Sequence, residues 1–227
     1  MTRFQDKEKA LALRRQEMSY SQIKTILGVG KGTLSAWLKD YPLSKERIDA
    51  LRGKNEKRIE RYRETRRKTK EKRLNEFYLE QKNRVFPLTD RDFFIAGLFL
   101  YWGEGTKTIS KTVSVSNTDP SVINFFLDWV INYLKIPKEK INIHLHLYND
   151  MDVEKEIEFW SEKINIPKNH FGKPYIKQSS IKAINHKGTF GHGTCNARIN
   201  NARLSEKILM AIKAVSDKYC NAPVAQW

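Results

Sequence analysis

The stretch Phe93-Phe-Ile-Ala-Gly-Leu-Phe-Leu-Tyr-Trp-Gly-Glu-Gly-Thr-Lys107 determines how the second part of this chain is interpreted. It has an apolar helix pattern that ends in one acidic residue, Glu104, between Gly103 and Gly105. A helix C-terminus carries partial negative charge, so a carboxylate there is unfavourable unless a cation lies nearby. A divalent metal ion is one such cation, and this makes Glu104 a candidate metal ligand.

The charge of the chain points to a polyanionic partner. The 227 residues carry a formal net charge of +16, an imbalance typical of proteins that bind nucleic acid or anionic surfaces. Residues 1–88 hold 24 Lys and Arg against 12 Asp and Glu, whereas residues 89–227 hold 18 against 14. The first part therefore supplies most of the electrostatic attraction, and the second resembles an ordinary folded domain in its charge.

Several protein classes are excluded by the sequence. The longest apolar run, from Phe93 to Trp102, is too short to span a bilayer, and no secretory signal pattern is present. Cys195 and Cys220 form neither a disulfide framework nor a zinc motif. No glycine-rich phosphate loop with a following Lys-Ser/Thr occurs. We expect a cytoplasmic, nucleoid-associated protein with no membrane partner and no nucleotide cofactor.

The N-terminal 43 residues have the pattern of three short helices. A helix is expected over Asp6–Glu17, and Ser19-Tyr-Ser-Gln22 is a capping box for a second helix that ends near Leu27. Gly28-Val29-Gly30 predicts a tight turn before a third helix over Lys31–Asp40. On the third helix Leu34, Trp37 and Leu38 are expected to face inward. The apolar positions of the whole pattern are Ile23, Ile26, Val29, Leu34 and Trp37. Two short helices across a glycine turn are typical of helix-turn-helix architecture, although a generic small helical bundle has the same pattern.

The run Ser21-Gln-Ile-Lys-Thr-Ile-Leu-Gly-Val-Gly-Lys-Gly-Thr-Leu-Ser-Ala-Trp-Leu38 resembles the helix-turn-helix of resolvases, transposases and small phage regulators. The resemblance covers about residues 7–40. It implies that the helix beginning at Lys31 enters the major groove of DNA. The polar residues expected on its outer face, and hence the predicted DNA contacts, are Lys31, Thr33, Ser35 and Lys39.

The segment that follows is strongly basic. Lys54–Arg73 holds 11 basic and 4 acidic residues in 20 positions, without Pro or Gly. One interpretation is a helix that follows the phosphate backbone, with Arg66 and Arg67 among its contacts. The other is a solvated linker that repels itself and stays extended. Both predict stronger nonspecific DNA binding with a steeper dependence on salt.

Residues 88–218 are expected to form an α+β domain with a mostly antiparallel sheet. Pro87, the capping residue Thr89 and the acids that follow it mark the start of the apolar helix. Alternating or β-branched patterns predict strands, and amphipathic patterns predict helices. Strands are expected over 108–116, 141–147, 175–184 and 193–199, and helices from 119 or 121 to 134, over 152–164 and over 204–215.

The order of these elements, together with Ile95-Ala-Gly-Leu-Phe-Leu-Tyr-Trp-Gly-Glu-Gly105, resembles the LAGLIDADG homing-endonuclease fold. The family motif is an apolar, glycine-containing helix that ends in an acid followed by Gly. Val115-Ser-Asn-Thr-Asp-Pro120 and Gly191-His-Gly-Thr-Cys-Asn-Ala-Arg-Ile199 are also similar to family features. The resemblance covers about residues 89–216. The motif differs from the family in having Glu for the usual Asp, Tyr101 and Trp102 before it, and an extra helix at 152–164.

The resemblance implies a catalytic arrangement. Two such helices would pair at a seam of small residues, and each would bring one acid to a shared Mg²⁺ site. One motif per chain implies a homodimer and a roughly palindromic double-stranded DNA target. The sheet would lie in the major groove. The residues assigned on this basis are Glu104 as metal ligand, Lys107 and Lys182 as catalytic support, Lys177 as a DNA contact, and Gly97, Gly103 and Gly105 on the dimer helix.

The sequence thus predicts a helix-turn-helix domain (1–43), a basic helical connector (44–87), a LAGLIDADG-like domain (88–218) and a tail (219–227). The predicted function is site-specific binding of double-stranded DNA by a dimeric, Mg²⁺-dependent endonuclease. A non-cleaving transcriptional regulator on the same fold, or a recombinase accessory protein, is the alternative. From spacing alone, Glu104 is also explained as a polar helix end followed by a capping glycine. An HNH nuclease centred on His170 and His186 fits the spacing poorly.

Overall fold

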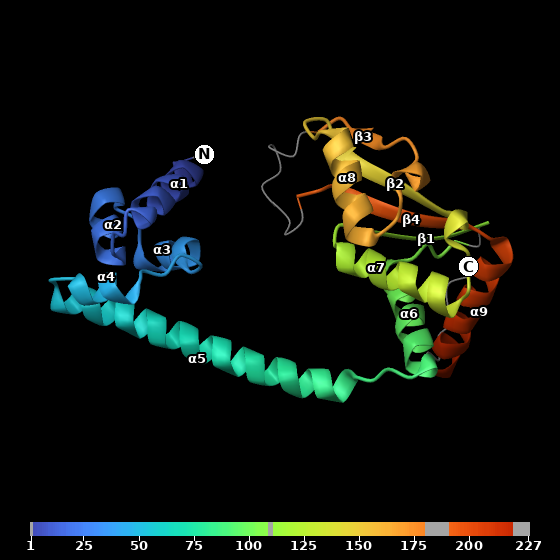
Figure 1. Ribbon diagram of the computed structural model, residues 1–227, viewed down its shortest axis with the longest axis horizontal. Coiled ribbons are helices and arrows are strands. Elements are labelled where there is room, and N and C mark those ends of the chain that lie inside the picture. Colours follow the sequence, from blue (N-terminus) through green and yellow to red (C-terminus); the bar gives the residue numbers. More distant parts are fainter. Residues whose placement is uncertain (1, 109–110, 180–190, 220–227) are drawn as a thin grey trace. The chain divides into compact units, whose positions relative to one another are not determined.

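A computed structural model describes residues 2–108, 111–179 and 191–219, and divides the chain into two compact units, Met1–Phe86 and Pro87–Trp227 (Figure 1). The predicted catalytic residue Lys182 lies outside the described residues. Among the residues described, no helix is both long enough and apolar enough to cross a membrane.

The first unit consists of helices α1 (Thr2–Arg15), α2 (Tyr20–Leu27), α3 (Lys31–Leu38), α4 (Lys45–Ala50) and α5 (Lys54–Val85). The capping box at Ser19 is confirmed, and Gly28 ends α2 in the left-handed conformation that glycine adopts without strain. Ala10, Ile23, Leu34 and Leu38 form the buried centre of α1 to α3. Ile26, an apolar position of the predicted pattern, lies outside this centre, since its side chain is 55% exposed.

Helix α5 is continuous over 32 residues, so in this structure the basic segment is a helix and not an extended linker (Figure 1). It belongs to the same compact unit as α1 to α3. The short helix α4, which the sequence did not reveal, precedes it and buries Ile48 with Leu43 and Leu51. The domain boundary drawn at residue 43 therefore falls between elements that pack together.

The second unit has the α+β fold class that the sequence predicts. Its elements are α6 (Asp90–Glu104), β1 (Thr112–Asn117), α7 (Pro120–Asp128) with a turn of π-helix (Trp129–Tyr133), a 3₁₀ turn (Lys138–Lys140), β2 (Ile141–Tyr148), α8 (Val153–Ile164), a second 3₁₀ turn (Lys168–His170), β3 (Tyr175–Lys177), β4 (Thr194–Asn200) and α9 (Ala202–Tyr219). The strands lie in the order β1-β4-β2-β3, with β2 and β3 parallel and the other pairs antiparallel.

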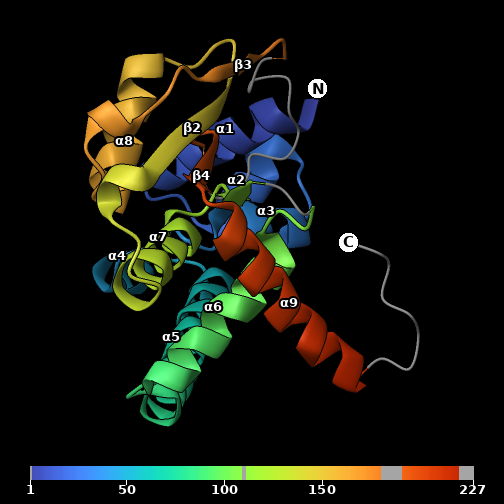
Figure 2. The ribbon, with the colours of Figure 1, turned by 90° about the vertical axis from the view of Figure 1, so that its right-hand side faces the viewer.

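Alternation along the strands separates the two faces of this sheet. Cross-strand rows of apolar side chains, such as Val115, Ala197 and Ile143, are fully buried. They form one core with residues of the surrounding helices, among them Leu98, Tyr101, Phe126, Trp160 and Leu209. Helices α6 and α9 lie side by side, as both views show (Figures 1 and 2). Among the described residues, the helices therefore pack on the apolar face of the sheet, and the other face carries the polar side chains.

Gly97 packs inside its own chain. A Cβ atom at this position would lie 2.2 Å from the indole ring of Trp129, and both residues are buried. Glycine is needed here because α6 passes directly over that ring. The prediction that Gly97 belongs to a helix seam between two copies is thus corrected.

Candidate nucleic-acid interface

The open face of the sheet is lined by polar side chains in register across the strands. Ser114 on β1 lies opposite Arg198 on β4, which in turn lies opposite Asn142 on β2. The next row holds Ser116, Asn196 and His144, and a third holds Thr194, His146 and Tyr175. These rows follow from the two-residue period of strands that bury their other face.

The four strands that form this face carry no carboxylate. The 24 residues of β1 to β4 include no Asp or Glu, whereas Arg198 and Lys177 supply positive charge. The Lys177 ammonium lies 4.8 Å from the centre of the Tyr148 ring, within cation–π range. A surface with cationic and amide groups and no acids is suited to a polyanion.

A shallow hollow of about 240 Å³ lies in the middle of the open face. Its lining includes His144, His146, Lys173, Tyr175, Asn196 and Arg198. Partial burial, with contributions from Lys177 and His144, holds the pKa of His146 below its usual value. The surroundings of His146 therefore disfavour its protonated form, whereas an anion bound beside it would favour that form.

Glu104 lies at the exposed C-terminal end of α6, at the edge of the sheet. Gly105 pairs with Val115 of β1, and the Thr106 amide donates to the carbonyl of Ser114. The side-chain amide of Asn117 lies 3.4 Å from Oε2 of Glu104. The helix end is therefore fixed against β1, and the carboxylate remains accessible.

Lys107 provides a cation at this helix end. Its ammonium lies 3.3 Å from the Gly103 carbonyl and 3.5 Å from that of Gly105. A cation at the C-terminal carbonyls offsets the negative end of the helix dipole. A carboxylate at a helix C-terminus requires a nearby cation, and Lys107 partly supplies one from within the chain. Lys107 therefore has a structural role at the helix end as well as its predicted catalytic one.

The other two glycines assigned to the dimer helix differ from each other. Gly105 lies beyond α6 in extended conformation, and a Cβ there would meet the ring of Tyr101 at 2.5 Å. Gly103 faces open space on the exposed side of the helix, where Phe99 is half exposed and stacks on Trp102. Gly103 is thus the one glycine of the three whose surroundings suit a seam with a second copy.

In the first unit, the predicted DNA contacts on α3 divide into two groups. Lys31 and Lys39 are exposed, and Thr33 is partly buried. Ser35 is also partly buried, and its hydroxyl accepts a hydrogen bond of 2.8 Å from Arg63 of α5. Ser35 thus has a structural role, because its hydroxyl joins α3 to α5, and its assignment as a DNA contact stays a prediction.

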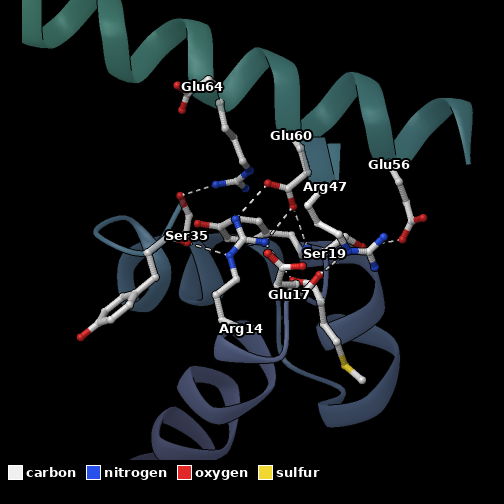
Figure 3. Close-up of polar contacts among 12 residues, drawn as sticks. Arg14, Glu17, Ser19, Ser35, Arg47, Glu56, Glu60 and Glu64 are labelled. Atoms are coloured by element: carbon white, nitrogen blue, oxygen red, sulfur yellow. Dashed lines mark hydrogen bonds and ion pairs between the residues drawn. The ribbon is translucent and has the colours of Figure 1, made fainter. Parts of the chain in front are cut away.

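A network of polar contacts holds the N-terminal part of α5 to the helix bundle (Figure 3). Glu60 forms a two-bond ion pair with Arg14, at 3.0 and 3.2 Å, and also accepts from the Tyr20 amide. Both charged side chains are only 3% exposed. Glu56 accepts from the Ser19 hydroxyl, and the Arg63 guanidinium lies 3.8 Å from the centre of the Tyr20 ring. The sequence showed only the charge of this segment and not these long-range partners.

Arg66 and Arg67, the predicted contacts on α5, lie just beyond this network. Arg67 is paired with Glu64 at 2.9 Å and with Glu71 at 2.7 Å, whereas Arg66 is exposed and lies over the Tyr62 ring. The two acids beside Arg67 raise the pKa of its guanidinium and reduce its net attraction for phosphate. Arg66 is therefore the better placed of the two to contact DNA.

Asn196 and Arg198 on β4 are not among the site residues that the sequence predicted. They lie on the central part of the open face because β4 pairs with both β1 and β2. The alternation of Cys195, Ala197 and Ile199 with polar residues was a usable signal for a two-faced strand. The position of β4 between β1 and β2 could not be predicted from the local sequence pattern.

Within the part of the chain that the structure describes, no group of three or more His, Cys, Asp or Glu side chains is placed to hold a metal ion. Glu104 is an exposed carboxylate, and Mg²⁺ is often held by one or two carboxylates together with substrate phosphates. Comparison with protein-family models, curated proteins and solved structures found no match to the chain.

Proposed function

We propose that this protein is a site-specific double-stranded DNA-binding protein that acts as a dimeric, Mg²⁺-dependent endonuclease of the LAGLIDADG kind. The observation that carries the proposal is the open face of the sheet, a polar, cationic surface without a carboxylate in a chain of net charge +16. The major groove of DNA is wide enough for strands of such a sheet. The exposed lysines of α3 offer a second contact surface in the other unit.

Arg198 and Asn196 are the residues of the open face best suited to read bases. They lie two residues apart on one face of β4, which separates them by about 7 Å. An arginine pairs with the O6 and N7 atoms of guanine, and an asparagine pairs with the N6 and N7 atoms of adenine. Lys177 lies on the edge strand β3, and Lys173 shortly precedes this strand. Both lysines are suited to contact DNA phosphates.

Glu104 is the proposed metal-binding residue. Bound Mg²⁺ would supply a metal-activated water and stabilise the leaving oxygen. In this chain, contacts with β1 hold the end of α6 and keep the carboxylate accessible. Each copy provides one Glu104, so the proposal requires two copies on the DNA.

The alternative is a non-cleaving regulator that uses the same fold for binding. It is favoured by the observation that the described residues place no group of three or more potential metal ligands at the end of α6. Such a protein would need the open face and the helix-turn-helix but not Glu104.

Capture of sheared genomic DNA by the purified protein, with and without Mg²⁺, distinguishes these functions. Near-palindromic enriched fragments with new Mg²⁺-dependent ends inside the site would support the endonuclease. Enrichment of uncut sites would instead support the regulator. Failure to enrich any sequence would refute site-specific binding, and with it both functions.

Two sets of variants then test the assignments. Glu104→Gln is expected to abolish cutting with binding retained, whereas Glu162→Gln, an exposed acid on α8, should change neither. Arg198→Ala is expected to weaken specific binding by about 1–3 kcal/mol and relax the sequence preference at one base pair. Lys207→Ala, an exposed lysine on the helical side, is its control. Equal effects of Arg198→Ala and Lys207→Ala would show that the open face does not read the DNA.

A further inference from the structure

One side of α5 is held to the helix bundle, and the two flanks beside that side differ. Glu60 and Arg63 bond to the bundle and mark the attached side. On one flank, Lys57 and Arg61 pair with Asp49 of α4. The opposite flank bonds neither to the bundle nor to α4, and its side chains are accessible.

This accessible flank carries a row of arginines with a tyrosine and a threonine between them. At 3.6 residues per turn, spacings of four, four, three and four residues keep the side chains within about 80° of one another around the helix. All of them are exposed. We refer to these residues as the arginine row: Arg58, Tyr62, Arg66, Thr69 and Arg73.

The acids of this part of α5 lie away from the arginine row. The acids between residues 54 and 73 are each about 120° or more around the helix from the centre of the row: Glu56, Glu60, Glu64 and Glu71. The first two bond to the bundle, and the last two pair with Arg67. Within the part of the chain that the structure describes, none of the three arginines of the row forms an ion pair. Their charge is therefore available to a partner.

The residue types of the row suit the phosphate groups of a nucleic acid. Arginine, tyrosine and threonine side chains all donate hydrogen bonds to phosphate oxygens in protein–DNA complexes. The flat guanidinium can donate two such bonds to one phosphate, and it also stacks on aromatic rings. Arg66 lies over the ring of Tyr62, at 5.7 Å from its centre, so part of the row is already arranged along the helix.

An anionic membrane is a poorer partner for this flank. A helix that lies on a membrane needs an apolar side that enters the bilayer as well as a basic side. Ile59 is the one aliphatic residue between residues 54 and 73, and it is partly buried. The row extends over about 22 Å, at 1.5 Å per residue, and contains no aliphatic side chain.

We infer that the arginine row binds the phosphate backbone of double-stranded DNA without reading its sequence. The contact surface is thereby limited to one flank of the basic helix, which adds Arg58, Tyr62 and Arg73 to the predicted contact Arg66. Arg67, which is paired with two acids, lies outside it. This role rests on the proposed DNA binding, but it requires neither cleavage nor base reading by α3 or the open face.

The salt dependence of binding to a labelled duplex of about 20 base pairs, with no selected sequence, tests the arginine row. Each phosphate contact contributes about 0.9 to the slope of the logarithm of the binding constant against the logarithm of the salt concentration. Arg58→Gln/Arg66→Gln/Arg73→Gln is therefore expected to reduce the slope by about 2.7. It should also weaken binding on the order of 100-fold at about 0.1 M salt.

The matched control is Lys57→Gln/Arg61→Gln/Lys68→Gln, which removes the same charge from the α4 flank of the same helix. These three side chains are paired with acids, so the slope should change by less than about 1. Glutamine has a helix propensity close to that of arginine and lysine. Far-ultraviolet circular dichroism would verify that both variants retain their helices.

Three results would overturn the inference: a slope unchanged in the row variant, an equal decrease in the matched control, or row-dependent binding to phosphatidylserine vesicles with unchanged binding to DNA. The proposed function is tested separately by the capture of genomic DNA. Loss of slope in the row variant without enrichment of any site would uphold the arginine row and refute site-specific binding. Enriched sites that the row variant binds as the wild type does would overturn the inference and leave the proposed function standing.

Discussion

The two units stabilise their helices by different means. In the second unit, helices cover the sheet through a continuous apolar core that includes Trp129, Trp160, Tyr101 and Phe126. In the first, the apolar centre is small, and α5 is attached through a buried ion pair and several hydrogen bonds. Apolar contacts tolerate small shifts, whereas a buried ion pair loses most of its value when one partner is removed. The first unit should therefore depend far more on single polar residues.

The largest expected effect is that of Glu60→Ala. It leaves the Arg14 guanidinium buried without its carboxylate and removes the acceptor of the Tyr20 amide, which together cost about 3–5 kcal/mol. Hydrogen exchange should show faster exchange in α1 to α3 and unchanged exchange in the second unit. Glu64→Ala, at a partly exposed position on the same helix, should cost about 0–1 kcal/mol. If the two variants unfold alike, the contrast between the units is not supported.

A pair of glycine substitutions on α6 tests the packing of the second unit. Gly97→Ala places a methyl group against the Trp129 ring and should destabilise the unit by about 1–3 kcal/mol. Gly103→Ala meets open space and should stabilise the helix by about 0.5–1 kcal/mol, because alanine has the higher helix propensity. Thermal unfolding of both variants gives the sign of each change in stability relative to the wild type. A destabilising Gly103→Ala would contradict the placement of α6.

Cys195 reports on the same core by its reactivity. The thiol is fully buried, and burial alone raises its pKa far above the ordinary value. It should resist alkylation in the native protein and react once the second unit unfolds. Peptide mapping by mass spectrometry measures Cys195 separately from Cys220. Rapid native labelling of Cys195 would show that this part of the sheet is open.

The smallest expected effect is a pH dependence from His146 on the open face. Because its pKa is lowered in the folded protein, the unfolded chain binds more protons just below the ordinary value of 6.5. Its contribution to stability is present above that pH and is lost as the pH falls. His146→Gln should flatten the decrease in the free energy of unfolding between about pH 7 and pH 5. A decrease of unchanged size would assign the dependence to other groups.

Local pattern was sufficient for the helix boundaries near Ser19 and Thr89, because capping side chains bond to amides three residues away. It was also sufficient for β2, since strict alternation marks a strand with one buried face. It did not reveal the packing partners of Ser35 and Gly97. Their partners, Arg63 and Trp129, lie about 30 residues away in the sequence and meet them through packing that no local period encodes.

The candidate site likewise has some features that the local sequence indicated and others that only the tertiary structure decided. The composition already indicated a polyanionic partner, and the acid at the end of an apolar helix already singled out Glu104. Both are properties of residue type and near neighbours. The central position of Arg198 and Asn196 and the docking of α5 by Glu60 depended on which strands and helices become neighbours. Strand order and helix docking arise from long-range burial of apolar area and pairing of buried polar groups, and these involve residues far apart in the chain.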